Sequence, residues 1–471
     1  MFSRRLFHAF CAAFFGVSIV AVVVAGTITV ASAQPPARIV APIAAPTPPM
    51  GWNSWDAYGL TINEADYKAN AQVLASFKSY GWNYAVIDEG WFLENPLNAG
   101  KPDTLKYTID AYGRVTPALN RFPSAANGAG FKPIADYAHS LGLKFGIHII
   151  RGIPKRAVKE NLTILNTSLH ASDAADTTDT CSWNPDNFGV KENAAGRAYY
   201  DSLIALYAGW GVDFLKVDCI ADHPYKADEI RMISAAIQKT GRPIVLSLSP
   251  GPTQLEHAAE IGEHAQMWRI ADDIWDGWEF PGQKWPNGLL SAFDNLSRWS
   301  RYARPGNWPD ADMLPWGYLG PEPGWGKARQ SALTQDEQRT QFTLWAIART
   351  PMILGANLTR LDDFTKSLLA NKEVIAINQT AIKSEEHSTY PEDPLRPRRW
   401  SAITGGTHPQ HYVAIFNLHD KPLKDDEPWL LFGLADKAHA GYDVWNKKHL
   451  PPSAKLHVEI PAHGCMLVRV E

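Results

Sequence analysis

Acidic side chains follow short apolar segments at several points along this chain, and they are the first sign of chemistry. The segment "AVIDEGWF" ends an apolar run on Asp88 and Glu89, with Trp91 beside them. A short Val/Ile run is typical of a buried strand, and an ionised carboxylate is costly to bury unless it is paired. The two acids therefore belong either to a structural ion pair or to a site that binds something polar.

The same arrangement recurs after other apolar runs. The polar residues at these positions are Asp56, Asp88, Glu89, His148, Arg151, Lys216, Asp218, Arg269, Asp272, Asp273 and Asp312. In a barrel of parallel strands the active site lies at the carboxyl ends of the strands. Many acids and few bases would then converge on one mouth.

Glycoside hydrolysis is the chemistry that fits such a mouth best. It needs two carboxylates on either side of one bond, and aromatic residues and further acids suit the rest of a sugar. The chain has 18 Trp and 16 Tyr, which serve either packing or sugar binding. Metal-assisted hydrolysis would need clustered histidine ligands, whereas His148 and His223 are isolated, and glycine-rich phosphate loops are missing. We expect a carbohydrate substrate and neither a metal nor a cofactor.

Position alone leaves the individual roles open. Asp218 lies two residues after Lys216, so both share one strand face, either as a buried pair or as parts of a site. Asp272 and Asp273 would face opposite sides of a strand, so that only one points inward. Arg269, four residues before Asp273, would share its face and pair with it or with the substrate.

Apolar strands alternate with helical segments from residue 50 onwards, which predicts a parallel sheet covered on both faces. The first helix is expected in "TINEADYKANAQVLASFKSYG", where Thr61 and Glu64 have the spacing of a capping box. Eight strands can be counted, and we favour a (β/α)8 TIM barrel. A doubly wound sheet is the alternative, but no glycine-rich fingerprint follows the first strand.

Four segments organise the chain. Residues 1–33, with a basic start, an apolar core and "ASA" before Gln34, are expected to be a secretory signal peptide, with an uncleaved anchor as the alternative. Residues 34–47 are a Pro/Ala-rich linker, 48–378 the catalytic barrel, and 379–471, with short alternating strands, a C-terminal antiparallel β-sandwich. The protein is thus expected to be exported, periplasmic or extracellular, with no stable membrane association after signal cleavage.

The net charge and the cysteines give little further information about function. The net charge of −4, without basic blocks, gives no reason to expect a nucleic acid partner, and the oligomeric state stays open. Cys465 is expected to be a buried free thiol. Cys181 and Cys219 could form one disulfide in an oxidising compartment.

Seven ordered motifs resemble glycoside hydrolase family 27, the α-galactosidases and α-N-acetylgalactosaminidases. They are "PPMGWNSW", "VIDEGW", "FLKVDC", "WRIADDIWDGW", "WPDADML", "ILGANL" and "EVIAINQT". The resemblance covers residues 48–471. It implies a retaining exo-glycosidase that releases terminal α-D-galactose by double displacement.

The resemblance also implies residue roles. The Lys-x-Asp motif makes Asp218 the nucleophile, and the fourth residue after the Arg of "WR" makes Asp273 the acid/base. The implied sugar-binding residues are Trp55, Asp88, Lys216, Arg269 and Asp312, to which we add Glu89, His148 and Ser249 at positions where the family usually differs. A family disulfide would match Cys181 and Cys219.

The departures bear on specificity. The family usually has Asp-Asp where this chain has Asp88-Glu89, a tyrosine in place of His148, and a Glu and Trp in the loop that here reads "SLSPGP". The longer Glu89 would extend into the space of the galactose hydroxymethyl group. This raises a β-L-arabinopyranosidase as the alternative, because β-L-arabinopyranose is galactose without that group. The other hypotheses are an isomalto-dextranase, an α-N-acetylgalactosaminidase and an inactive sugar-binding barrel.

Overall fold

A computed structural model of the protein describes residues 43–101, 104–320, 326–387 and 393–471. The expected signal peptide and most of the expected linker lie outside these residues. Within the described ranges, no helix combines the length and the apolar character needed to cross a bilayer.

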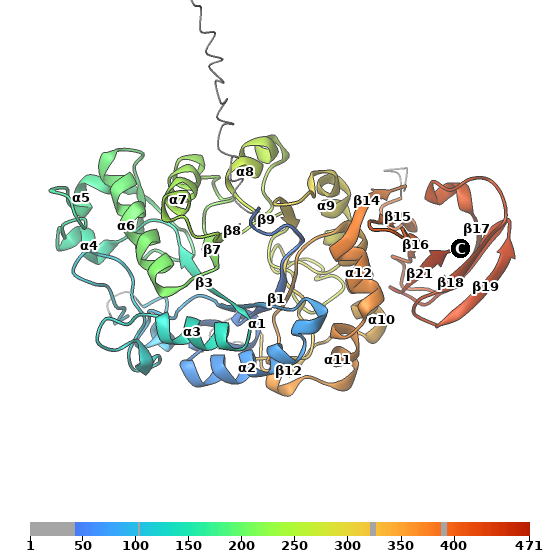
Figure 1. Ribbon diagram of the computed structural model, residues 1–471, viewed down its shortest axis with the longest axis horizontal. Helices are drawn as coiled ribbons and strands as arrows, with labels where there is room; N and C mark the ends of the chain where they lie inside the picture. Colours follow the sequence, from blue (N-terminus) through green and yellow to red (C-terminus); the bar gives the residue numbers. More distant parts are fainter. Residues whose placement is uncertain (1–42, 102–103, 321–325, 388–392) are drawn as a thin grey trace, which may run out of the picture. The chain divides into compact units, whose positions relative to one another are not determined.

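Eight parallel strands form the central sheet, as expected for a TIM barrel (Figure 1). In chain order they are β1 (Met50–Asn53), β2 (Tyr84–Ile87), β3 (Lys144–Ile150), β7 (Phe214–Asp218), β8 (Val245–Leu248), β9 (Met267–Arg269), β10 (Trp308–Asp310) and β13 (Met352–Leu354). The two end strands, β10 and β13, are joined just beyond β10. Leu314 N donates to Ile353 O at 2.8 Å, and Gly355 N donates to Leu314 O at 3.1 Å. The sheet thereby curls round on itself.

Most of the barrel helices connect successive strands and cover the outside of the sheet (Figure 1), whereas α1 (Trp55–Tyr58) lies at the cavity mouth and α11 (Asp363–Leu369) and α12 (Lys372–Thr380) follow the last strand. The connecting helices are α2 (Glu64–Ser76), α3 (Lys132–Ser140), α6 (Ala194–Trp210), α7 (Ala227–Thr240), α8 (Ala258–His264), α9 (Ser291–Trp299) and α10 (Gln335–Ala348). The capping prediction for Thr61 was wrong. Asn63 caps α2 by accepting from Asp66 N, while the Thr61 hydroxyl donates to Tyr58 O at 2.6 Å.

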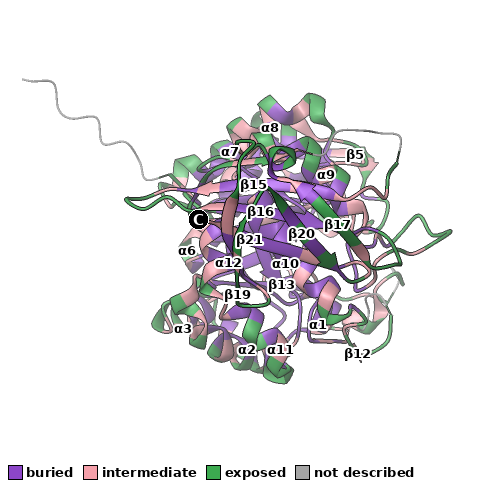
Figure 2. Cartoon of the chain, turned by 90° about the vertical axis from the view of Figure 1, so that its right-hand side faces the viewer, coloured by how far each residue is buried: buried purple, intermediate pink, exposed green. Residues whose placement is uncertain are grey.

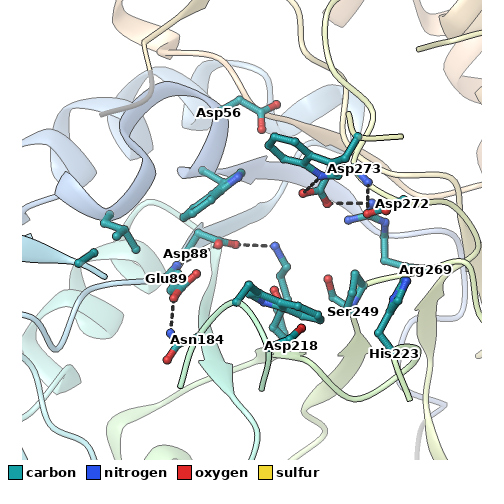
Figure 3. A pocket seen from close by; sticks show the side chains of 18 of the residues that line it. Asp56, Asp88, Glu89, Asn184, Asp218, His223, Ser249, Arg269, Asp272 and Asp273 are labelled. Carbon is teal, nitrogen blue, oxygen red and sulfur yellow. Dashed lines mark hydrogen bonds and ion pairs between the residues drawn. The ribbon is translucent and has the colours of Figure 1, made fainter. Parts of the chain in front are cut away.

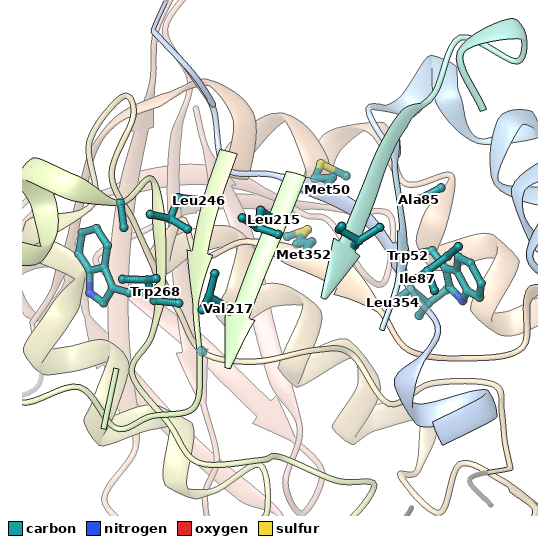
Figure 4. Close-up of a cluster of buried hydrophobic side chains, with 14 of the residues drawn as sticks. Met50, Trp52, Ala85, Ile87, Leu215, Val217, Leu246, Trp268, Met352 and Leu354 are labelled. Atoms are coloured by element: carbon teal, nitrogen blue, oxygen red, sulfur yellow. The ribbon is translucent and has the colours of Figure 1, made fainter. Parts of the chain in front are cut away.

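Alternate side chains of each barrel strand point in opposite directions, either towards the helices or into the barrel. One set of side chains packs against the helices and includes Trp52, Ile87, Val217 and Trp268 (Figure 4). The other set fills the barrel interior with Tyr84, Val86, Phe214, Val245, Met267, Trp308 and Ile353. Side chains alternate along a strand, so the next interior positions towards the carboxyl ends are Asp88, Lys216, Ser247, Arg269 and Asp310. Polar residues therefore lie directly above an apolar floor.

Gly146 of β3 shows how tightly this interior is packed. A Cβ at residue 146 would lie 2.8 Å from a methyl carbon of Val86 and 3.1 Å from the Cβ of Phe214. Only glycine leaves room for both neighbours. His148, two residues later, has the same parity and pairs in register with Lys216.

Two antiparallel sheets follow the barrel. The first contains β14 (Ala381–Glu386), β15 (Arg398–Thr404), β16 (His411–Phe416), β21 (Cys465–Val470), β18 (His439–Asp443) and β19 (Lys448–Ser453), and the second pairs β17 (Leu423–Pro428) with β20 (Lys455–Ile460). Val413 and Ile415 of β16 pack towards the second sheet, whereas Ala414 and Phe416 join the barrel core. Figure 2 shows β16 mostly buried and β17 mostly exposed. This is the expected sandwich.

A small three-stranded sheet is inserted between β3 and α6. It consists of β4 (Ile153–Pro154), β5 (Ala175–Thr180) and β6 (Asn187–Val190). The turn between β5 and β6 is fixed by a disulfide between Cys181 and Cys219, with a Cα–Cα distance of 6.0 Å. The disulfide prediction is thus confirmed, and it places the turn next to the end of β7. Cys465 forms no disulfide and is half-buried.

Candidate active site

A cavity of about 610 Å³ opens at the carboxyl ends of the barrel strands, a size typical of small-molecule sites. The structure brings most of the predicted site residues together there. Those that line it are Trp55, Asp88, Glu89, Lys216, Asp218, Ser249, Arg269, Asp273 and Asp312. His148 does not line the cavity: it is fully buried and within hydrogen-bond distance of Asp218.

Asp218, at the end of β7, is held by donors from two directions. His148 Nε2 lies 3.2 Å from one carboxylate oxygen, and the backbone N–H of Cys219 donates to the other. Burial alone would raise the pKa of Asp218, but the His148 hydrogen bond and the charges of His148 and Lys216 lower it below its usual range. Asp218 is therefore ionised at neutral pH.

Asp88 is paired more completely. Its Oδ2 accepts from Lys216 Nζ at 2.9 Å and from Asn53 Nδ2 at 2.6 Å. Burial opposes ionisation, yet the charges of Lys216 and His148 lower the pKa of Asp88 and keep it a carboxylate. A fixed carboxylate beside a fixed ammonium group offers both an acceptor and donors to a ligand hydroxyl.

Glu89 continues the row beyond Asp88. Its Oε1 accepts from Asn184 Nδ2 at 2.6 Å, so the side chain lies between Asp88 and Asn184 (Figure 3). Burial raises the pKa of Glu89 to about 7, reinforced by Asp218 and opposed by His148. Asn184 comes from the β5–β6 turn, 95 residues away along the chain.

Arg269, at the end of β9, joins two carboxylates. Its Nη1 pairs with Asp312 Oδ1 at 2.8 Å and its Nη2 with Asp273 Oδ1 at 3.2 Å. The other oxygen of Asp273 accepts from Trp285 Nε1 at 3.2 Å. Asp273 thus has a donor on each oxygen while one third of its side chain stays exposed to the cavity mouth.

The prediction that Asp272 and Asp273 face opposite sides was wrong. Strand β9 ends at Arg269, so both aspartates lie in the following loop, where strand alternation no longer applies, and both line the cavity. Asp272 accepts from the backbone N–H of Asp273 at 2.8 Å. Burial, followed by the charge of Asp273, raises the pKa of Asp272.

The structure adds residues to which the sequence analysis gave no role, although it had counted Asp56 among the acids at the strand ends. Asp56 lines the cavity and is buried, and its Oδ2 has no hydrogen-bond partner among the described residues. Burial, with Asp312 and Asp273 nearby, raises the pKa of Asp56 well above its usual range. Its place after β1 was a signal, but Asn184, Trp183 and Trp285 come from loops, where no periodicity indicates direction.

Comparison with known proteins agrees with the fold and the site. A family model described as alpha galactosidase A matches residues 174–380. The α-galactosidase of Cyamopsis tetragonoloba is 32% identical over 89% of this chain and 85% of its own length. Alpha-galactosidase A of Homo sapiens is 30% identical over 88% of each.

Two solved structures are closer in sequence. A family 27 β-L-arabinopyranosidase from Geobacillus stearothermophilus is 41% identical, with a TM-score of 0.83, over 91% of this chain and 97% of that chain. A putative α-N-acetylgalactosaminidase from Bacillus halodurans is 39% identical, with a TM-score of 0.79, over 92% and 99%.

The barrel, its acidic cavity and these relatives define a glycosidase. The chain belongs to glycoside hydrolase family 27.

Proposed function

We propose that the protein is a retaining exo-glycosidase in which Asp218 is the nucleophile and Asp273 the acid/base. The observation that carries this proposal is the different setting of the two carboxylates. Asp218 is held ionised by His148 and Lys216, while Asp273 lies apart from it at the cavity mouth (Figure 3), where a leaving group would depart.

The reaction needs no group beyond these two and water. Asp218 attacks the anomeric carbon while Asp273 gives its proton to the departing glycosidic oxygen, which leaves a glycosyl ester on Asp218. Asp273, now a carboxylate, takes a proton from water, and the resulting attack on the anomeric carbon frees Asp218. Arg269, which contacts both Asp273 and Asp312, holds the acid/base in place through both steps.

The sugar we propose is β-L-arabinopyranose, with α-D-galactose as the second substrate. The two share every ring hydroxyl, and galactose adds only a hydroxymethyl group. Asp88 and Lys216 can form hydrogen bonds with hydroxyls that both sugars carry. Glu89, one methylene longer than aspartate, reaches into the space that the galactose hydroxymethyl group needs, and Asn184 fixes it there. The 41% identity to a β-L-arabinopyranosidase supports the same choice.

Hydrolysis rates on matched nitrophenyl glycosides test both the proposed roles of the two aspartates and the proposed sugar. We expect hydrolysis of the β-L-arabinopyranoside at least as fast as that of the α-D-galactoside, and faster than that of the α-N-acetylgalactosaminide and α-glucoside. Asp218→Asn and Asp273→Asn should each abolish most activity, with surface-exposed Asp136→Asn as the matched control. Proton NMR of the first-formed sugar should show retained anomeric configuration. A wild-type protein inert on all four substrates would overturn the proposal.

We also propose that the chain is exported. The basic and apolar character of residues 1–33 and the Cys181–Cys219 disulfide, a bond typical of oxidising compartments, support export. N-terminal sequencing of protein recovered outside the cytoplasm should begin near Gln34. Intact Met1 on all of the protein would contradict cleavage.

A further inference from the structure

Two tryptophans at the cavity mouth are exposed, in contrast to most tryptophans of the described chain. Trp183 is 45% exposed and Trp285 is 43% exposed, whereas Trp52, Trp91 and Trp268 are at most 1% exposed. Both exposed rings line the cavity. Large apolar side chains that stay exposed where they line one cavity commonly mark a binding site.

Trp183 is fixed in position although its ring is open to solvent. It lies in the β5–β6 turn, two residues after Cys181, whose disulfide ties the turn to Cys219, the residue that follows Asp218. The next residue, Asn184, holds the turn from the other side through Glu89. The Trp183 ring meets the ring of His223 edge-on, with centroids 6.3 Å apart and an interplanar angle of 85°.

Trp285 belongs to the loop between β9 and α9, which is fixed in a similar way. Asn287 N donates to Asp273 O at 2.8 Å, and Trp275 N donates to Asn287 O at 3.0 Å. The Trp285 ring N–H donates to Asp273 Oδ2. Trp285 thus contacts the proposed acid/base directly, whereas Trp183 lies in a turn that the disulfide ties to the residue after Asp218.

We propose that Trp183 and Trp285 form a leaving-group subsite that binds a neutral ring with a flat apolar face, either a pyranose or an aryl group. This inference rests on the proposed function. The polar groups that suit the sugar transferred to Asp218, which are Asp88, Lys216 and Arg269, lie at the carboxyl ends of the barrel strands, so the leaving group extends towards the rim.

The rim of the cavity disfavours negatively charged leaving groups. Asp272 and Asp273 both line the cavity, and their carboxylates oppose a second negative charge. An indole face attracts the C–H face of a sugar or the edge of an arene without needing charge. The rim chemistry therefore selects for ring shape rather than for anionic groups.

The test compares benzyl with methyl β-L-arabinopyranoside, whose leaving groups are both simple alkoxides but of which only benzyl alcohol carries a ring. Wild type should prefer the benzyl glycoside in kcat/KM. Trp183→Ala should lower the benzyl-to-methyl ratio by about tenfold, and Tyr112→Ala, which removes an exposed aromatic residue outside the cavity, should leave the ratio unchanged. A disaccharide with a pyranose leaving group forms a parallel arm, and the arm with the larger loss identifies the ring that the subsite prefers.

Trp285 needs one further variant because it also contacts Asp273. Trp285→Phe keeps a ring but removes the N–H donor, so it should retain more of the benzyl preference than Trp285→Ala. Equal loss in the two variants would remove Trp285 from the subsite. Calorimetric binding of benzyl 1-thio-β-L-arabinopyranoside, which resists hydrolysis, should weaken in Trp183→Ala.

The outcomes separate this inference from the function on which it rests. The subsite proposal would be overturned if wild type hydrolysed both glycosides without preferring the benzyl one. It would also be overturned if neither tryptophan substitution changed the benzyl-to-methyl ratio. In both cases the glycosidase proposal would stand. A wild type inert on every glycoside would overturn both.

Discussion

Shortening Glu89 to aspartate should move the specificity of the enzyme towards galactosides. Glu89→Asp withdraws the carboxylate by about 1.5 Å and breaks the 2.6 Å hydrogen bond from Asn184, so the vacated space matches one hydroxymethyl group. One methylene in such a pocket is worth about 1–3 kcal/mol, or roughly 10- to 150-fold. The galactoside-to-arabinopyranoside ratio of kcat/KM should therefore rise at least about tenfold.

The assay measures both nitrophenyl substrates at the same pH with the same enzyme preparation. Glu94→Asp is the matched control, since Glu94 is exposed and lies outside the cavity, and its ratio should equal that of wild type. Wild-type protein with a strong galactoside preference that survives Glu89→Asp unchanged would refute the crowding argument.

Three further predictions concern charge and stability. His148→Tyr introduces the usual family residue and removes a positive charge from beside Asp218, which should raise the pKa of Asp218. The acidic limb of the pH profile of kcat/KM should therefore move up by about one pH unit. A limb that does not move would contradict the role of His148 in keeping Asp218 ionised. Folding raises the pKa of Asp56, so stability declines as pH rises above its unfolded value of about 3.9. Asp56→Asn should therefore raise Tm at pH 7 but not at pH 3, as calorimetry can check, and an equal change at both would exclude titration as the cause. Cys181→Ser opens the 38-residue loop closed with Cys219 and should cost about 3–4 kcal/mol of stability; denaturant unfolding that matches wild type would count against it.

The sequence was sufficient for the architecture because the strands carry their own pattern. Val/Ile-rich segments separated by helices predict a parallel sheet, and residue parity within a strand then places Asp88, Lys216 and Arg269 on one side. The helix start was predicted less well: both Thr61 and Asn63 can cap a helix, and local spacing favoured the wrong one. Asn63 prevails because its side chain reaches the backbone of Asp66.

Parts of the site depended on contacts between distant segments. Asn184 meets Glu89 in a turn that strand pairing and a disulfide place near the end of β7. Parity also fails as soon as a strand ends, as Asp272 and Asp273 show after the short strand β9. The sequence could name the acids at the mouth, but tertiary packing determines which side chains contact one another.

Covalent trapping of the intermediate tests the central claim most directly. An activated, fluorine-substituted β-L-arabinopyranoside, whose glycosyl ester hydrolyses slowly, is incubated with the wild-type enzyme, and peptic peptides are analysed by mass spectrometry. The account predicts one added glycosyl group, on the peptide that contains Asp218. A label on another carboxylate, or turnover with inverted configuration and no labelled peptide, would contradict it.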